Sequence, residues 1–565
     1  MNEQQHRLQD TLIHVAKRLR NADFPNSVVA QLEMLAQQVP QPCVIAVVGR
    51  VKAGKSSFIN ALLREDLAKV GATETTATIN YFRGGVPNSL LPVRCYWRSG
   101  HVSDENRQFL DGLQGNDMET LRKADGIDHL EYLVQNPYLE QITLVDTPGT
   151  GSAIDEHQNR IAEYINLSRQ LRERHHQDTQ RIGSEADAII YLIGATATTN
   201  DKAFLEEFQQ ATQGQSRSLN AIGVLAQIDL NEEVIKRRED LSKKIALQLQ
   251  QSLNTVIPVS AGMRRALDSL LAQEQTGLKQ MIATQRAIPP DTLDLLLADS
   301  DSYLDPACPV SVDERKQVRG DMPWGVFVRI ARIVVDPALD IASIVKRLEI
   351  IAGFDKLHEV LDQHFVKRGT LLRGYRIVND ALKVIEDVKF SYLREYRRRQ
   401  AENDDKRKRF LYFIQHIHEA SPVVQELATF IEVQLAPRAN LDQIVEEVQR
   451  ELSIIRYELE VYNLDFAALQ QMEDNTSLFT NEELEELRPL FGLYGLEMEK
   501  RLPVGSITLS HVGLRQRYWD LKSKVGYAAV FREVAQHAAR RYGMFIDTLI
   551  TQNRDTRNIG HRGNE

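Results

Sequence analysis

The sequence has few cysteines, few prolines and glycines, and no long apolar run. Its 565 residues include 3 cysteines, 18 prolines and 30 glycines. Three widely spaced thiols cannot form a paired disulfide framework or a zinc site, so they indicate buried apolar side chains in a reducing compartment. The shortage of proline and glycine leaves little room for low-complexity linkers. No window approaches about 18 uncharged apolar residues, which excludes a bilayer-spanning helix.

The N-terminus and the charge balance also exclude several classes of protein. Residues 1–7 are polar, and neither a Sec nor a Tat signal is seen. We therefore expect a cytoplasmic protein whose membrane contacts, if it makes any, are peripheral. A net charge of −9 does not favour a purely electrostatic nucleic-acid binder. No nucleic-acid partner is expected.

Short apolar runs rich in β-branched residues recur in the first half of the chain, separated by helical or polar stretches. Strands that alternate with helices predict an α/β domain with a doubly wound, mainly parallel sheet. The runs cover residues 43–48, 142–145, 188–193, 221–225 and 256–259.

The pattern becomes helical after about residue 262. From Leu441 to Leu469 the apolar residues recur in steps of three and four, which is the heptad spacing of a coiled coil or helical bundle. A second apolar series, from Leu514 to Leu549, predicts another long helix. The sequence therefore predicts an all-α, elongated bundle after the α/β domain.

A glycine-rich loop follows the first apolar run. Residues 49–57 read Gly-Arg-Val-Lys-Ala-Gly-Lys-Ser-Ser and precede a helical pattern, which matches a phosphate-binding loop in its strand–loop–helix context. Gly49 and Gly54 let backbone N–H groups turn toward phosphate oxygens. We expect Lys55 to reach the β- and γ-phosphates and Ser56 to ligate magnesium. The adjoining Ser57 is assigned to the same nucleotide site.

Two further segments are predicted to contact the γ-phosphate and magnesium. Asp146, at the end of the 142–145 strand, can hold magnesium through water, and Gly149 can offer its N–H to a γ-phosphate. The threonine-rich residues 71–78 lie between this motif and the phosphate loop. A hydroxyl there, such as that of Thr76, can close over magnesium and position the attacking water.

A base-reading motif is expected after the 221–225 strand. Asp229 stands where a carboxylate can accept the guanine N1 and N2 protons, but Gln227 replaces the lysine whose stem packs on the base. Ser260 and Ala261 follow the last strand, where a backbone N–H can meet guanine O6. Guanine is the predicted base, although Gln227 leaves an ATP-dependent scaffold open.

Residues 49–63, together with Thr75 and Thr76, resemble the dynamin superfamily, and bacterial dynamin-like proteins and mitofusins within it. The resemblance implies a GTPase domain over residues 39–366, with a helical insertion at about 263–350. Residues 353–361 resemble the last helix of such a domain. Residues 1–38 and 367–565 would then form the helical neck and trunk.

The same resemblance implies magnesium-dependent hydrolysis of GTP to GDP and phosphate. Thr76 would position the attacking water. Dynamin-like proteins use no switch-two glutamine, and residues 150–152 supply none. Instead their GTPase domains pair face to face across the nucleotides, so we expect self-association, with a second dynamin-like protein as a further partner. Lys52 is a candidate for stabilising the transition state from within the loop. The alternative is a solvated or ion-paired Lys52.

Membrane contact is expected from two segments. Arginines and lysines are dense over residues 394–409, and apolar residues stand in a less regular stretch at 473–508. If the helix from about residue 367 turns near residue 404, both segments reach the same tip, where basic and apolar groups suit anionic lipids. A solvated helix face beside a small core is the alternative.

Three other functions remain open. A soluble switch GTPase could bind a protein partner through its helices, and a P-loop ATPase scaffold is compatible with Gln227. A scaffold that does not hydrolyse nucleotide is disfavoured by Lys55, Ser56, Thr76 and Asp146.

Overall fold

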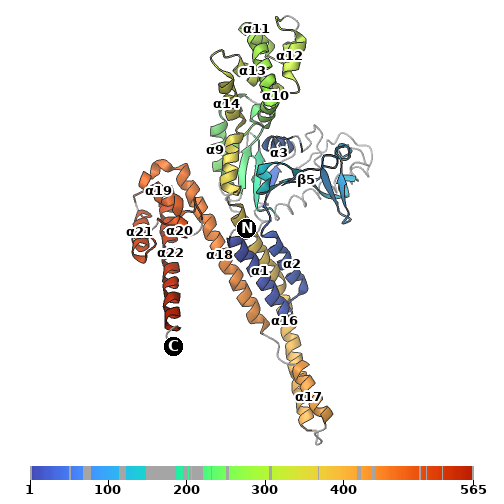
Figure 1. Cartoon of the computed structure of the whole chain (residues 1–565), viewed down its shortest axis with the longest axis vertical. Coiled ribbons are helices and arrows are strands. Elements are labelled where there is room, and N and C mark those ends of the chain that lie inside the picture. The colour runs from blue at the N-terminus through green and yellow to red at the C-terminus, as the bar shows by residue number, and fades with distance from the viewer. Residues whose placement is uncertain are drawn as a thin grey trace. The chain divides into compact units, whose positions relative to one another are not determined.

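The computed structural model divides the chain into two compact units (Figure 1). One unit comprises Pro42–Leu372 and the other combines Met1–Gln41 with Arg373–Glu565. No helix among the described residues is long and apolar enough to cross a membrane. The structure describes residues 3–49, 53–65, 67, 78–113, 123–147, 186–194, 202, 205, 221–230, 232–249, 253–304, 308–366, 368–416, 422–434, 440–495, 498–503, 505–524 and 526–562.

The Pro42–Leu372 unit is built on a nine-stranded sheet of order β4-β3-β5-β2-β6-β1-β7-β8-β9. The five predicted strands lie side by side and parallel in this sheet, and their side chains are almost all buried because helices cover both faces. The predicted fold class is confirmed. The parallel strands are β1 (Cys43–Gly49), β6 (Ile142–Asp146), β7 (Ala188–Ile193), β8 (Ala221–Leu225) and β9 (Val256–Pro258).

The remaining four strands were not predicted. β2 pairs antiparallel with β6 and parallel with β5, and β3 pairs antiparallel with both β5 and β4. Polar side chains interrupt all four strands, so they lack the continuous apolar runs that mark a strand covered on both faces. They are β2 (Ile79–Gly84), β3 (Val93–Trp97), β4 (Val102–Glu105) and β5 (Ile127–Val134).

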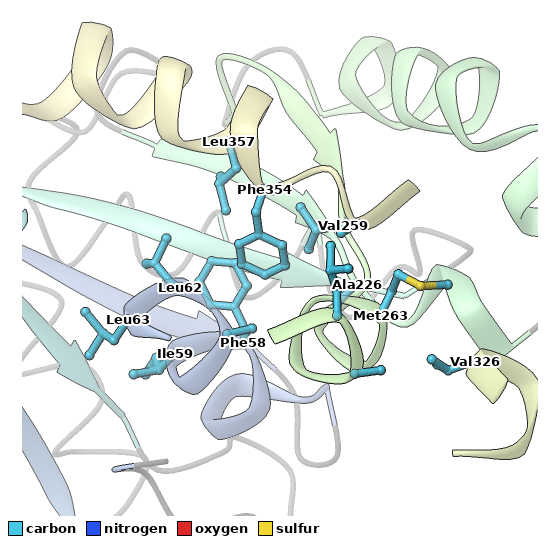
Figure 2. Close-up of a cluster of buried hydrophobic side chains, with 14 of the residues drawn as sticks. Phe58, Ile59, Leu62, Leu63, Ala226, Val259, Met263, Val326, Phe354 and Leu357 are labelled. Carbon is cyan, nitrogen blue, oxygen red and sulfur yellow. The ribbon is translucent and has the colours of Figure 1, made fainter. Parts of the chain in front are cut away.

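The described residues between β9 and the end of this unit are helical. Their apolar side chains pack against the helix that follows the phosphate loop, α3 (Lys55–Leu63), so the predicted insertion shares one core with the sheet. In Figure 2, Phe58 of α3 faces Phe354, and Met263 and Val326 lie in the same cluster. The helices are α10 (Ala261–Arg286), α11 (Pro290–Leu296), η4 (Ser302–Leu304), α12 (Val312–Arg319), α13 (Trp324–Val334), α14 (Ile341–Ala352), α15 (Phe354–Leu361) and η5 (Asp362–Val366).

Gly353 fixes this helical part to the end of β9. Its φ of 75° is left-handed, and a Cβ atom there would lie 2.3 Å from the Pro258 carbonyl oxygen. The Ser260 N–H donates to the Ala352 carbonyl at 3.0 Å. Only glycine therefore fits the junction between α14 and α15. The shorter helices of the unit are α4 (Arg107–Asp111), η1 (Pro137–Glu140), η3 (Ile228–Leu230), α8 (Glu232–Lys236) and α9 (Arg238–Gln248).

The other unit is helical. The predicted heptad series lies on α18 (Leu441–Asp474), where Val448 and Leu452 are fully buried. Arg7 and Arg18 of α1 form ion pairs with Glu458 and Glu447 of α18. The helices are α1 (Glu3–Asn21), α2 (Asn26–Gln38), α16 (Gly369–Gln415), α17 (Pro422–Gln434), α18, η6 (Thr476–Leu478), α19 (Asn481–Leu490), α20 (Met498–Arg501), α21 (Leu509–Lys522) and α22 (Ala529–Arg562).

Two helix predictions in this unit are wrong. The helix that was expected to turn near residue 404 continues to Gln415, and Asp405 there pairs with Arg409 one turn later. The series from Leu514 to Leu549 is divided between α21 and α22, with Gly526 at a φ of 114° between them. Leu514 is 64% exposed. The apolar spacing continues across the break, but a left-handed glycine cannot continue a helix.

The expected lipid-contacting tip at residues 473–508 also differs from the structure. Within this segment, Leu490 and Phe491 are fully buried and pack in a core with Trp519 and Tyr542. These two side chains lie in the small core that was the alternative to lipid contact, because α21 and α22 provide an apolar surface that covers them. Leu493 and Tyr494 remain exposed.

Candidate nucleotide-binding site

The phosphate loop joins the end of β1 to the start of α3. Gly54 has a φ of 84°, a left-handed conformation that side chains with a Cβ atom rarely adopt. A Cβ atom at Gly49 would lie 3.1 Å from the Leu192 carbonyl oxygen of β7. Both motif glycines therefore meet a geometric requirement of the loop. Ala53 is half-buried, and residues 50–52, which include Lys52, lie outside the described residues.

Lys55 begins α3 with its side chain folded back over the loop. Its Nζ donates to the Gly49 carbonyl at 3.2 Å, and only 7% of the residue is exposed. Burial lowers the pKa of Lys55, while the charge of Asp146 acts in the opposite direction. The ammonium group thus stands desolvated at the N-terminus of a helix. Anionic phosphate oxygens would favour its charged form there.

Ser56 and Asp146 meet across 90 residues of sequence. The Ser56 hydroxyl donates to Asp146 Oδ2 at 3.2 Å. Burial raises the pKa of Asp146 to about 6, although the Lys55 charge and the hydrogen-bonding groups of Ser56 and Asn80 all lower it. The other oxygen of the carboxylate, Oδ1, is buried without a hydrogen-bond partner. Hydroxyl and carboxylate oxygens are the ligands that a hard divalent cation takes, so this pair fits magnesium.

Thr147, directly after Asp146, is a positioning residue to which the sequence assigned no role. It is fully buried, and its hydroxyl donates to the Val47 carbonyl of β1 at 2.9 Å. This bond ties the chain after β6 to the neighbouring strand and so fixes where Asp146 points. A hydroxyl directly after a buried strand was the available signal, because a buried hydroxyl requires a partner.

The residues assigned to the base come together at the ends of β8 and β9. The Ser260 hydroxyl donates to Asp229 Oδ1 at 2.7 Å and accepts from the Met263 N–H at 3.0 Å, which caps α10. A Cβ atom at Gly262 would lie 3.1 Å from Asp229 Oδ2. Ala261 is the first residue of α10. The Asp229 carboxylate is thus oriented by a helix cap.

Gln227 links the base motif to the phosphate loop. Its backbone has a φ of 57°, and its side-chain Nε2 lies 3.6 Å from the position that a Cβ atom of Gly54 would occupy. The side chain therefore lies against the loop, where the lysine of the usual motif is expected. An amide offers this site a shorter stem and no charge.

The site residues of the sequence analysis fall into two groups. The structure places one group at the carboxyl ends of β1, β6, β8 and β9, which is where open α/β sheets bind ligands. Ser57 belongs to this group and is half-buried in the first turn of α3. Thr76 and Gly149, like Lys52, lie outside the described residues. The described members of the group are Gly49, Gly54, Lys55, Ser56, Ser57, Asp146, Gln227, Asp229, Ser260 and Ala261.

A phosphate loop with these partners on a mainly parallel sheet defines a P-loop nucleotide-binding protein. Comparison with known families indicates which kind of P-loop protein this is. Residues 45–228 match the model of the dynamin family. This part of the chain is therefore similar to the dynamin family, as the phosphate loop and the paired threonines predicted.

Individual relatives are distant. The chain is 26% identical over 356 residues to the isoniazid-induced protein IniC of Mycobacterium tuberculosis, covering 62% of this chain and 68% of that protein. It is 25% identical over 238 residues to the "probable transmembrane GTPase FZO-like, chloroplastic" of Arabidopsis thaliana. This match covers 42% of this chain and 20% of that protein. A solved structure of an oligomerised bacterial dynamin pair shares 14% identity and a TM-score of 0.31, covering 100% of this chain and 93% of that one.

The match of residues 45–228 to the dynamin family indicates the reaction class. Dynamin-family proteins are GTPases, so the predicted GTP hydrolase activity is confirmed at the level of the family. The roles assigned to individual site residues stay predictions.

Proposed function

We propose that this dynamin-like GTPase hydrolyses GTP with magnesium bound at Ser56 and Asp146, and that pairing of its GTPase domains couples hydrolysis to membrane binding or remodelling. The remodelling would be fusion, fission or vesicle release. The observation that carries the magnesium assignment is the contact between Ser56 and Asp146, whose Oδ1 is buried without a hydrogen-bond partner. A buried carboxylate oxygen without a partner is costly unless a ligand completes the site.

In this proposal the protein supplies position and charge. Magnesium, when bound, would offset the negative charge of the β- and γ-phosphates. Lys55 would hold the same phosphates, and its contact with the Gly49 carbonyl keeps its ammonium group over the loop. Because the ammonium group is already desolvated, little solvent reorganisation would accompany nucleotide binding.

Three proposed participants come from the sequence alone. Thr76 would contribute to magnesium binding and orient the attacking water, and the Gly149 N–H would contact the γ-phosphate. Lys52 would offset charge that develops between the β- and γ-phosphates. Because residues 150–152 are Thr-Gly-Ser, no glutamine follows Gly149 to orient the water.

Guanine recognition would depend on Asp229 and on the backbone at Ala261. The hydrogen bond from Ser260 orients the Asp229 carboxylate for two guanine N–H donors. Gln227 would cover the base less fully than a lysine stem would. We therefore propose selective but weak guanine binding.

Pairing of GTPase domains would position the attacking water, which a switch-two glutamine does in other GTPases. Self-association, with a second dynamin-like protein as a further partner, follows from the family resemblance. Peripheral lipid contact is proposed on the same ground.

Turnover of GTP measured against protein concentration, with and without anionic liposomes, tests the proposal. Catalytic pairing predicts that specific activity rises with protein concentration and rises further on liposomes. A constant specific activity that liposomes do not change would contradict both pairing and membrane coupling.

One observation favours the alternative of a switch protein whose helices bind a protein partner. Much of the basic run is neutralised within its own unit, because Arg397 pairs with Asp442, and Arg398 and Arg399 both pair with Glu395. These exposed pairs are individually weak, but the paired carboxylates lower the net positive charge that the run offers to lipid headgroups. Turnover that responds to a protein partner but not to liposomes would support the alternative.

A further inference from the structure

The start of α13, in the helical part that follows β9, lies against the segment that carries Asp229. A Cβ atom at Gly325, the second residue of this helix, would lie 3.0 Å from the Asp229 carbonyl oxygen. Such a separation is shorter than an ordinary van der Waals contact. The absence of a side chain at Gly325 therefore lets the base-reading segment approach the helix as closely as it does.

The carboxylate of Asp229 lies close to the same helical part. A Cβ atom at Gly262 of α10 would lie 3.1 Å from Asp229 Oδ2 and also 3.1 Å from Val326 Cγ2. Val326 is fully buried and belongs to the same apolar cluster as Met263 of α10 (Figure 2). The backbone and the side chain of Asp229 are thus both next to helices that the nucleotide-binding motifs do not include.

Aromatic side chains hold the start of α13 in place. Trp324 stacks on Phe327 with ring centroids 5.6 Å apart, and Phe327 meets Tyr303 at 4.7 Å. The Arg319 guanidinium lies over the Trp324 ring, 5.5 Å from its centroid. Phe327 and Tyr303 are fully buried. Because a closely packed interior resists displacement, α13 is a fixed support for the segment beside it.

The segment around Asp229 is less constrained than α13. It is a single 3₁₀ turn, η3, in which Ile228 is fully buried and Asp229 is half-buried. The preceding Gln227 is exposed. Short 3₁₀ turns have poorer hydrogen-bond geometry than α-helices. A side chain added at Gly325 should therefore displace Asp229 locally, while Ile228 keeps the turn anchored and α13 stays in place.

We propose that Gly325 is a positioning residue for guanine recognition, because it sets where the Asp229 carboxylate stands. The inference rests on the proposed guanine binding by Asp229 and adds to it a residue that no nucleotide-binding motif contains. A carboxylate that accepts two N–H donors must satisfy both distances and angles together, and hydrogen bonds weaken steeply outside these limits. A small displacement of Asp229 would thus weaken base recognition and leave the phosphate contacts of Lys55 unchanged.

Competition between two nucleotides tests the inference in the full-length protein with magnesium. GDP and inosine diphosphate would each displace a fluorescent GDP analogue, and neither diphosphate has a γ-phosphate to be hydrolysed. Inosine diphosphate lacks the guanine 2-amino group, so it can donate only one of the two hydrogen bonds to Asp229. The wild-type protein is expected to prefer GDP at least about tenfold, because a hydrogen bond to a charged group is lost with inosine.

Gly325→Ala is expected to reduce this preference for GDP at least about threefold, and the larger side chain of Gly325→Val should reduce it further. The matched control is Gly513→Ala, because Gly513 lies within α21, where a Cβ atom would meet no other described segment within 4 Å. The control should keep the wild-type preference. The urea midpoint of Gly325→Ala should stay close to that of the wild-type protein, since alanine favours a helix over glycine.

The outcomes separate the role of Gly325 from guanine recognition itself. If the wild-type protein binds the two nucleotides equally, guanine recognition by Asp229 fails and the inference fails with it. If the wild-type protein prefers GDP and Gly325→Ala keeps the same or a greater preference, recognition stands and the positioning role is wrong. An equal loss of affinity for both nucleotides in Gly325→Ala would also overturn the positioning role, because the base would not be involved.

A double-mutant cycle tests whether Gly325 acts through Asp229. Asp229→Ala removes the carboxylate, so adding Gly325→Ala to this variant should reduce the preference for GDP no further. A further reduction in the double variant would mean that Gly325 acts through another group, and the inference would be wrong.

Discussion

Each unit of the molecule contains a fully buried aspartate, and the two are satisfied in opposite ways. Asp146, in the unit with the sheet, accepts a hydrogen bond from Ser56 and leaves Oδ1 without a partner. Asp465, in the helical unit, is contacted by Arg501 at 2.6 Å, by His537 at 2.9 Å and by Arg541. Burial alone therefore does not distinguish a ligand site from a structural ion cluster. The number of partners already present does.

The two pKa shifts express this difference. Burial raises the pKa of Asp146 to about 6, because the Lys55 charge, the Ser56 hydroxyl and the Asn80 side chain only partly oppose it. Burial also acts to raise the pKa of Asp465, but the hydrogen bond with His537 and the charges of Arg541 and Arg501 outweigh it and hold that pKa below its ordinary value. Asp146 gains from a bound cation, whereas Asp465 already has its cations.

The largest expected effect comes from Asp465→Asn. The change leaves Arg501 and Arg541 buried without a counter-charge, and we expect it to lower the free energy of unfolding by about 3–5 kcal/mol. Urea denaturation monitored by circular dichroism measures this loss. Asp442→Asn on the same helix is the control, since Asp442 pairs with the exposed Arg397 and the change should cost less than about 1 kcal/mol. Equal losses in the two variants would contradict the structural role of the cluster.

Asp146→Asn is expected to lower activity strongly and to change stability little, the reverse of Asp465→Asn. It removes a desolvated charge, so the free energy of unfolding should change by less than about 1 kcal/mol. GTP turnover in magnesium should fall by about 100-fold, since a proposed magnesium contact is lost. Steady-state phosphate release at matched magnesium concentrations measures this. A variant with near-normal turnover would remove Asp146 from the proposed magnesium site.

The smallest effect concerns pH. The pKa of Asp146 is raised from 3.8 to about 6 in the folded chain. The folded state therefore binds this proton more tightly than the unfolded chain, and the contribution of Asp146 to stability falls as the pH rises through that window. Asp465, with its lowered pKa, makes a stabilising contribution that is lost as the pH falls.

Magnesium competes with the same proton on Asp146. Lowering the pH from 7 to 5 should weaken magnesium-dependent GTP binding by about tenfold, because a group with a pKa near 6 loses that fraction of its charged form. Titration of a fluorescent GTP analogue, with and without chelator, measures the effect. Asp146→Asn cannot titrate, so the same pH profile in this variant would assign the effect to another group.

Strong local patterns in the sequence predicted part of the fold. The parallel strands were continuous apolar runs, and the phosphate loop was fixed by its glycines, of which Gly54 is left-handed. The strands β2 to β5 were missed because polar residues interrupt their apolar runs. The turn expected near residue 404 was wrong because Asp405 pairs with Arg409 within one helix.

In the candidate site, too, residues in local motifs were predicted and a residue that acts across strands was not. Lys55, Ser56 and Asp146 stood in motifs whose order along the chain identified them. Thr147 was given no role, since its bond to the Val47 carbonyl crosses from one strand to another and leaves no mark in the spacing.

The sequence by itself determined the local geometry and the chemical groups: a glycine-shaped loop, a lysine and serine at a helix start, and carboxylates at strand ends. These features depend on neighbours only a few residues away. The tertiary structure alone decided which oxygen of Asp146 lacks a partner and why Phe491 is buried while Phe413 is exposed. Burial and hydrogen bonding depend on segments far apart in the sequence, and helical spacing marks a face without showing what covers it.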